Sequence, residues 1–161
     1  MNRIALTCTL AVLTALTGLE CAAQTASEDA APIISSPQTA RFNAVPFLPP
    51  CMRVAVVQGD PRKGASVQLA RIAPGCFIPP HWHTANTRLI FVSGYGTHRV
   101  KGEALRTLHA GDYVYLPARK IHSFRCSSGC VVYNLQDEAD VVHWIDARGR
   151  DITPARAFHI H

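Results

Sequence analysis

The sequence predicts an all-β domain, a sandwich or barrel built from short strands. From about residue 42 the chain alternates short apolar runs with turn residues at a spacing of roughly 8–12 residues, which is typical of antiparallel β-proteins. No long segment of this region shows the 3.6-residue apolar period of an amphipathic helix. With 161 residues the chain has room for one such domain and not comfortably for two.

The expected strands follow one another with turn residues at their boundaries. Gly59-Asp60-Pro61 separates the first two apolar runs, and Ser128-Gly129 separates two runs near the end. These residue types favour turns because they tolerate or preset the turn dihedral angles. The runs that we expect to form strands are 52–58, 66–72, 88–93, 95–101, 104–108, 113–116, 121–126, 131–135 and 141–145, with one short helical turn at 154–158.

The first residues have the layout of a secretory signal peptide. One positive charge at Arg3 precedes an apolar run that ends near small residues, so we expect cleavage after Ala23. The run is shorter than the roughly 20 residues that a membrane-spanning helix needs. Lipidation at Cys21 is a lesser alternative, because Glu20 precedes it. We therefore expect a periplasmic or secreted protein with no membrane span after cleavage.

The remaining chain divides by composition. Residues 24–41 are rich in Ala, Ser, Thr, Gln and Pro and lack periodicity, which is typical of a flexible leader. The predicted organisation is a signal peptide at 1–23, this leader at 24–41, a β-domain at 42–146 and a C-terminal tail at 147–161.

Four cysteines lie outside the predicted signal peptide: Cys51, Cys76, Cys126 and Cys130. An even number of cysteines in an exported chain favours disulfides. Cys126 and Cys130 flank a three-residue turn, so a local bridge between two strand ends is sterically reasonable, and a Cys51–Cys76 bridge would follow by subtraction. Buried free thiols are the alternative.

The formal net charge of +5 comes from scattered basic residues. The sequence contains no basic helix and no basic stripe interleaved with aromatic residues, so we expect no nucleic-acid binding. It also lacks the P-loop, the GxGxxG fingerprint and the GxSxG nucleophile elbow. A partner of the small-molecule class is the remaining expectation.

The most specific chemical signal is a pair of histidines one residue apart, His81 and His83, entered through Pro79-Pro80. In a strand, side chains i and i+2 point to the same face, about 6.6 Å apart along the chain. Two imidazoles can lean together from that spacing and share one ion, since metal–nitrogen bonds are roughly 2.0–2.1 Å long. The pair therefore predicts half of a metal site on a strand.

A second segment supplies a third histidine. Gly111 leads into an expected strand, Pro117 ends that strand, and His122 opens the next one. In order and spacing the two segments resemble the two motifs of the cupin superfamily, in particular small single-domain bacterial cupins, over about residues 45–146. The matching positions are Gly75, His81, His83 and Gly94 in the first motif and Gly111, Pro117 and His122 in the second. The resemblance implies a jelly-roll β-barrel with a divalent metal inside.

Three positions depart from the cupin motifs. Thr87 stands where the family has a glutamate ligand, Arg119 stands where it has a glycine, and Cys126 where it has an asparagine. The predicted site therefore offers three neutral imidazoles and no carboxylate. Such a site holds a divalent metal with open positions for water or substrate, and the uncompensated charge favours anionic or chelating oxygen ligands. The same departures would also mark a vestigial site.

Further residues are candidates for the surroundings of the site. His98 is a candidate fourth ligand or proton relay, although a hydrogen-bonded, partly exposed strand histidine is the commoner case. Cys126 shares strand parity with His122 and is a candidate soft ligand or redox group, unless a disulfide with Cys130 consumes it. The apolar residues Leu89, Phe91 and Phe124 are expected as pocket walls for a small, partly hydrophobic ligand.

Three roles compete on this basis. The first is an exported metalloenzyme of dioxygenase or related type, with iron, zinc, manganese, nickel or copper bound by His81, His83 and His122. The second is a non-catalytic module that binds a small molecule or a metal at a degenerate site, and a purely structural barrel is the third. An exposed sheet edge also makes a homodimer a candidate assembly.

Overall fold

The structure is a computed structural model that describes residues 31–159. The predicted signal peptide at 1–23 and the first part of the predicted leader lie outside these residues. From Ile33 onward the chain forms one unit. Within the described part, no helix is long and apolar enough to cross a membrane.

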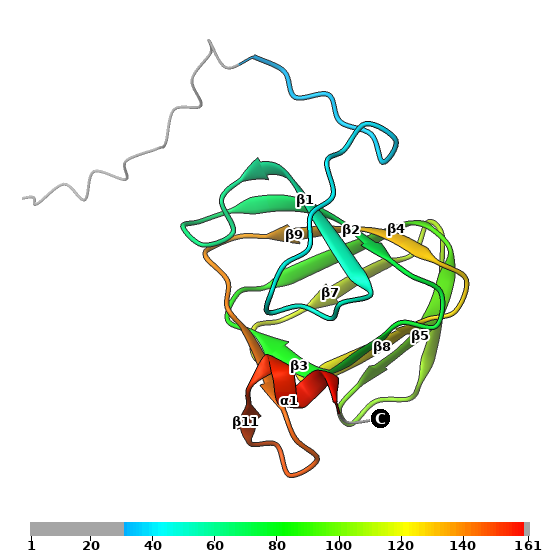
Figure 1. Ribbon diagram of the computed structural model, residues 1–161, viewed down its shortest axis with the longest axis vertical. Helices are drawn as coiled ribbons and strands as arrows, with labels where there is room; N and C mark the ends of the chain where they lie inside the picture. The colour runs from blue at the N-terminus through cyan, green and yellow to red at the C-terminus, as the bar shows by residue number, and fades with distance from the viewer. Residues whose placement is uncertain (1–30, 160–161) are drawn as a thin grey trace, which may run out of the picture. The chain divides into compact units, whose positions relative to one another are not determined.

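This unit consists of two antiparallel sheets with the core between them (Figure 1). The first sheet has five strands in the order β1 (Met52–Gly59), β2 (Ser66–Ile72), β9 (Cys130–Gln136), β4 (Thr87–Ser93) and β7 (Tyr113–Leu116). The second has six in the order β11 (Asp151–Ile152), β10 (Val142–Ile145), β3 (Phe77–His83), β8 (His122–Cys126), β5 (Tyr95–Val100) and β6 (Arg106–His109). The predicted all-β class is confirmed, and each predicted run matches a strand to within two residues at either end.

The chain continues to build structure after residue 146, where the sequence prediction ended the domain. Strand β11 pairs with β10, and the helix α1 (Pro154–Phe158) follows. Thr153 caps this helix by accepting a hydrogen bond from the backbone N–H of Arg156. Ala157 is buried in the core, and the Phe158 ring packs edge-on against Trp144 with centroids 5.0 Å apart. These contacts attach the C-terminal segment to the second sheet.

The inward-facing side chains of the first sheet change from polar to apolar along the strands. Antiparallel pairing places residues of β2, β9 and β4 in rows across the sheet. The rows are Ser66, Gln136 and Thr87, then Gln68, Asn134 and Leu89, then Ala70, Val132 and Phe91. The space between the sheets therefore has a polar end and an apolar end.

Two disulfides lie at the apolar end and join Cys51 to Cys76 and Cys126 to Cys130. These are the pairs expected from the turn between Cys126 and Cys130. The backbone N–H of Cys126 donates to the carbonyl of Cys76, so the two bridges are neighbours. Because its sulfur is bonded to Cys130, Cys126 does not act as a soft ligand or a thiol redox group, and that alternative is wrong.

Candidate metal centre

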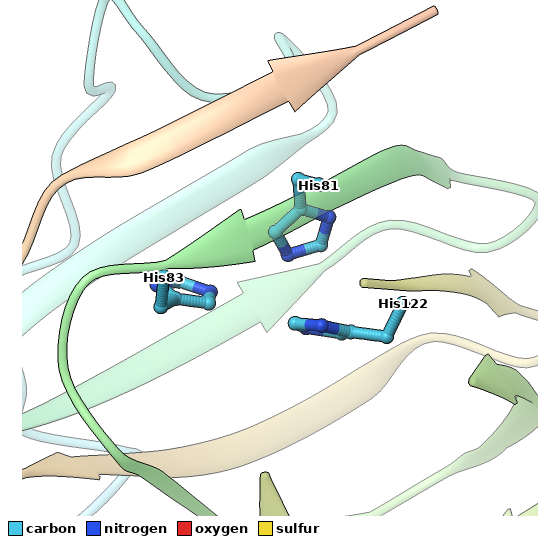
Figure 2. A group of neighbouring side chains, drawn as sticks. All are labelled: His81, His83 and His122. Atoms are coloured by element: carbon cyan, nitrogen blue, oxygen red, sulfur yellow. The ribbon is translucent and has the colours of Figure 1, made fainter. Parts of the chain in front are cut away.

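The structure brings together the three histidines that the sequence singled out. His81 and His83 extend from β3, and His122 extends from β8 into the same space (Figure 2). His81 and His122 are directly opposite each other across the two strands, and their ring centroids are 4.1 Å apart. One ring nitrogen from each histidine lies within 4.8 Å of the other two.

A bulge in β3 aims the histidine pair inward. Ile78 and His81 are three residues apart, yet both are buried, and strict alternation would place them on opposite faces. The register between β3 and β8 shifts between these two residues, where Pro79 and Pro80 stand. Prolines cannot donate to a ladder and are tolerated at such irregularities. The Pro-Pro pair is thus the local reason that His81 and His83 both reach the interior.

Backbone carbonyls set the tautomers of two of the histidines. Nδ1 of His81 lies 2.7 Å from the carbonyl oxygen of Pro79, and Nδ1 of His122 lies 2.9 Å from that of Lys120. A carbonyl oxygen only accepts hydrogen bonds, so each Nδ1 carries the proton. Nε2 of each neutral ring then keeps its lone pair for a metal ion, which is the usual arrangement of metal-binding histidines.

The third histidine is oriented by Asp140, a residue that the sequence analysis missed. Nδ1 of His83 donates to the carboxylate of Asp140 at 2.6 Å, and the Asp140 side chain is only 4% exposed. The same carboxylate accepts hydrogen bonds from the backbone N–H of Ala85 at 3.1 Å and from Nε2 of Gln136 at 2.5 Å. Asp140 stands behind His83 and does not take a ligand position, so this carboxylate orients one of the three imidazoles that form the candidate ligand set.

No sequence motif marks Asp140. It lies two residues before Val142, which pairs with His83 across β10 and β3. Only that pairing brings residues 57 positions apart into contact. The one available signal was an acidic residue directly before a predicted strand, which by itself indicates nothing about metal binding.

Burial keeps two of the histidines, His81 and His122, neutral. It lowers the pKa of His81 well below its ordinary value, and the neighbouring His122 and His83 add to the effect. Burial, together with His83, lowers the pKa of His122 to about 3. Burial alone would raise the pKa of Asp140, but the hydrogen bonds from His83, Ala85 and Gln136 bring it below its ordinary value. At neutral pH the site therefore combines the neutral imidazoles of His81 and His122 with the ionised carboxylate of Asp140.

Thr87 and His98 border the three histidines without joining them. Thr87 is 1% exposed, occupies the position on β4 at which the cupin motif has a glutamate, and lines the same cavity as the three histidines. His98 is 4% exposed and its ring centroid lies 5.5 Å from that of His122. The prediction of a partly exposed, hydrogen-bonded His98 is wrong, because Nε2 has no hydrogen-bond partner among residues 31–159. Burial lowers the pKa of His98.

The departure from the cupin motif at Arg119 can be understood from the backbone conformation of this residue. Arg119 stands at the family's glycine position and has a φ of 65°, the left-handed region that favours glycine. Its N–H donates to the carbonyl oxygen of His83 at 2.8 Å, and its guanidinium lies over the Trp82 ring. The turn between β7 and β8 therefore has a backbone conformation that favours glycine, and Arg119 adopts it at a cost of about 1 kcal/mol.

A cavity of about 590 Å³ between the two sheets contains the three histidines. The expected apolar walls Leu89, Phe91 and Phe124 all line it. The segment before β1 borders the cavity too. It is attached to both sheets, because Asn43 pairs with Val54 of β1 and the indole N–H of Trp144 donates to the carbonyl of Phe47.

The donor set fits a divalent transition metal after a movement of the side chains. Nitrogens that bind one ion at about 2.1 Å in tetrahedral geometry lie about 3.4 Å apart, so a pair near the 4.8 Å limit needs to approach by about 1 Å. Rotation about the Cα–Cβ bonds of the imidazole side chains supplies a movement of this size. Three neutral imidazoles suit zinc, iron, nickel and copper and leave positions for oxygen ligands.

Comparison with known proteins agrees with the fold. A family model described as Cupin domain matches residues 68–135. A search of curated protein sequences finds no match. The structure is similar to an RmlC-like cupin from Shewanella frigidimarina, with a TM-score of 0.56 and 16% identity over 68% of this chain and 93% of that one.

Two enzymes share the same fold. One is the DMSP lyase DddQ from Ruegeria pomeroyi, with a TM-score of 0.55 and 17% identity over 65% of this chain and 61% of that one. The other is a variant of salicylate 1,2-dioxygenase from Pseudoaminobacter salicylatoxidans in complex with gentisate. Its TM-score is 0.51, and it is 15% identical over 58% of this chain and 29% of that one. At these identities the likeness shows the fold alone. The matched family model identifies residues 68–135, which carry both histidine motifs, as a cupin domain.

Proposed function

We propose that this chain is an exported metalloprotein in which His81, His83 and His122 bind one divalent metal ion, and that it acts on a small molecule as a dioxygenase-like metalloenzyme. We also infer that its two sheets close into the jelly-roll barrel of the cupins. Export is supported by the arrangement of residues 1–23 and by two disulfides, which persist in oxidising compartments. A homodimer through an exposed sheet edge remains part of the proposal.

The observation that carries the metal proposal is the hydrogen bond that each imidazole makes through Nδ1, which leaves Nε2 for a metal ion. All three Nδ1 atoms are engaged, by the carbonyls of Pro79 and Lys120 and by the carboxylate of Asp140. A vestigial site has no need to orient three rings toward one point. Such orienting partners raise the basicity of histidine ligands and hold their geometry.

A metal bound here supplies Lewis acidity and open coordination positions for an oxygen-bearing ligand. The protein contributes the rest. Asp140 holds the proton on Nδ1 of His83, and the apolar walls exclude water from the ligand's body. Two neighbours in the fold, a dioxygenase and a lyase, are enzymes, which supports a catalytic role.

The second candidate function is a binding module without catalysis. One observation favours it: Asp140, the buried carboxylate beside the histidines, already accepts hydrogen bonds from several groups and is poorly placed to take a proton from a substrate. Such a module would hold the same metal and the same class of ligand and release both unchanged.

Metal analysis tests the proposal directly. We expect the mature protein, purified from the periplasm under anaerobic conditions, to carry close to one divalent ion per chain. A protein that stays free of iron, zinc, manganese, nickel and copper, and takes up none on dialysis, would refute the metal site. Oxygen uptake with a panel of diketones, thiols and phenols then separates an enzyme from a binding module.

Asp140 gives a second test of the site. Replacing it with asparagine keeps the shape but removes the charge that holds the proton on Nδ1 of His83, so we expect metal affinity to fall by about 10- to 100-fold. The measurement is competition with a chromophoric chelator. Asp137→Asn, a change of an exposed aspartate near the start of the same turn, is the matched control and should leave the affinity unchanged. Equal affinities for wild type and Asp140→Asn would contradict the role of Asp140.

A further inference from the structure

Three polar atoms buried in the cavity have no hydrogen-bond partner. They are Oγ1 of Thr87, Oδ1 of Asn134 and Nε2 of His98, and they are the buried side-chain polar atoms of residues 31–159 for which this is true. All three residues line the cavity that contains the histidine cluster. Buried polar groups in proteins are nearly always paired, so such a concentration at one place calls for an explanation.

Thr87 and Asn134 are neighbours on the inner face of the first sheet. Thr87 pairs with Gln136, which is two residues from Asn134 on the same face of β9. The other polar side chains nearby are already engaged, because Nε2 of Gln68 donates to Gln136 at 2.8 Å and Gln136 in turn donates to Asp140. The free hydrogen-bonding capacity of this face therefore belongs to Thr87 and Asn134.

These two residues stand opposite the histidines. The three histidines lie on β3 and β8 of the second sheet, whereas Thr87 and Asn134 lie on β4 and β9 of the first. Packed sheets are about 10 Å apart at the backbone, so side chains of the first sheet that extend into this space are close enough to contact a ligand bound at the histidines. His98 borders the same space from β5 of the second sheet.

The cavity walls between the three histidines and the pair Thr87 and Asn134 are apolar and partly aromatic. Leu89 is directly opposite Asn134 across β4 and β9. Phe91 and Phe124, from different sheets, pack edge-on with ring centroids 5.4 Å apart. A flat, apolar body suits these walls, with a polar group at each of its ends.

We propose that Thr87 and Asn134 form a hydrogen-bonding subsite for a hydroxyl group at one end of a small, flat carboxylic acid, whose carboxylate lies at the histidine cluster. The proposal rests on the metal site proposed above. Three neutral imidazoles leave the charge of a divalent ion uncompensated, which favours an anionic oxygen ligand. Asn134 Oδ1 accepts the hydroxyl proton, Thr87 Oγ1 donates to the hydroxyl oxygen, and His98 Nε2 lies at the margin of the subsite.

The test compares benzoate with 3- and 4-hydroxybenzoate by isothermal titration calorimetry of the mature protein. In both hydroxy acids the hydroxyl is too far from the carboxylate to bind the same ion. We expect the better of the two to bind about five-fold more tightly than benzoate, the effect of one net hydrogen bond. The variants Thr87→Val and Asn134→Leu keep side-chain size and should each reduce this ratio toward one without weakening benzoate. Thr97→Val, on β5 and outside the cavity lining, is the control and should keep the ratio.

Each titration is run with Co²⁺-loaded and with metal-free protein, so that the two proposals can fail separately. If Co²⁺ neither raises the affinity for the acids nor changes its visible spectrum when they bind, the metal proposal is wrong. The hydroxyl ratio in the metal-free protein still tests the subsite in that case. A ratio near one in wild type, an unchanged ratio in both variants, or no binding of any of the three acids would overturn the subsite. Circular dichroism of each variant confirms that it is folded.

Discussion

Replacement of His122 by alanine is expected to lower metal affinity by about 100-fold or more, whereas the same change at His98 should leave it within a few-fold of wild type. The loss of a direct ligand costs more than the roughly 10- to 100-fold that follows from the loss of a residue behind one. His122 belongs to the group of three nitrogens within 4.8 Å of one another, and His98 does not. Affinity is measured by competition with a chromophoric chelator for Co²⁺ and Zn²⁺.

His98 is a well-matched control. Both histidines are buried, at 5% and 4% exposure, and they lie on adjacent strands of the same sheet with ring centroids 5.5 Å apart. Truncating either leaves a cavity of similar size, so a general loss of stability would affect both variants alike. Equal losses of metal in the two variants would mean that His98 is a fourth ligand or that the site depends on packing alone. Retention of full affinity in His122→Ala would remove His122 from the site.

Acidification is expected to destabilise the metal-free protein between pH 6.5 and pH 4.5. Burial lowers the pKa of His81 and brings that of His122 to about 3, so both bind protons more weakly in the folded than in the unfolded state. Their neutral forms thus contribute stability that is complete above the unfolded pKa of about 6.5 and is lost as the pH falls toward the folded pKa. The expected slope is about 1.4 kcal/mol per pH unit for each of the two histidines.

Urea unfolding in the presence of a chelator measures this slope. The interval ends at pH 4.5 so that Asp140, whose pKa lies below its ordinary value, stays ionised in the folded protein. The variant His122→Gln has no titrating group at this position, and its slope should be smaller by about one proton. A free energy of unfolding that is flat from pH 6.5 to pH 4.5, or a slope that the variant does not change, would show that these histidines are accessible to protons in the folded state.

The local pattern of the sequence was sufficient for the fold class and for the central residues. The spacing of apolar runs and turn residues located the strands, because alternation and turn chemistry are properties of neighbouring residues. The pair His81 and His83 identified the same cluster that the structure brings together with His122. The two cysteines that flank a three-residue turn likewise form the bridge expected from that turn.

The residues around the three histidines could not be predicted from local sequence patterns. His98 looked like a surface strand residue, but the sheet that faces it buries its ring. Asp140 belongs to no motif, and only the pairing of β10 with β3 places its carboxylate beside His83. Both outcomes depend on contacts between segments far apart in the chain, for which a single sequence has no local pattern.

The sequence by itself determined that this protein is a β-domain of the cupin kind with three histidines in two motifs. It could do so because strand periodicity, turn chemistry and motif spacing are set within short stretches of chain. Only the tertiary structure decided how those histidines are held, with the carbonyls of Pro79 and Lys120 and the carboxylate of Asp140 on the three Nδ1 atoms. It also decided that Thr87 and Asn134 line the same cavity as these histidines, because the relative position of two sheets follows from packing of the whole domain.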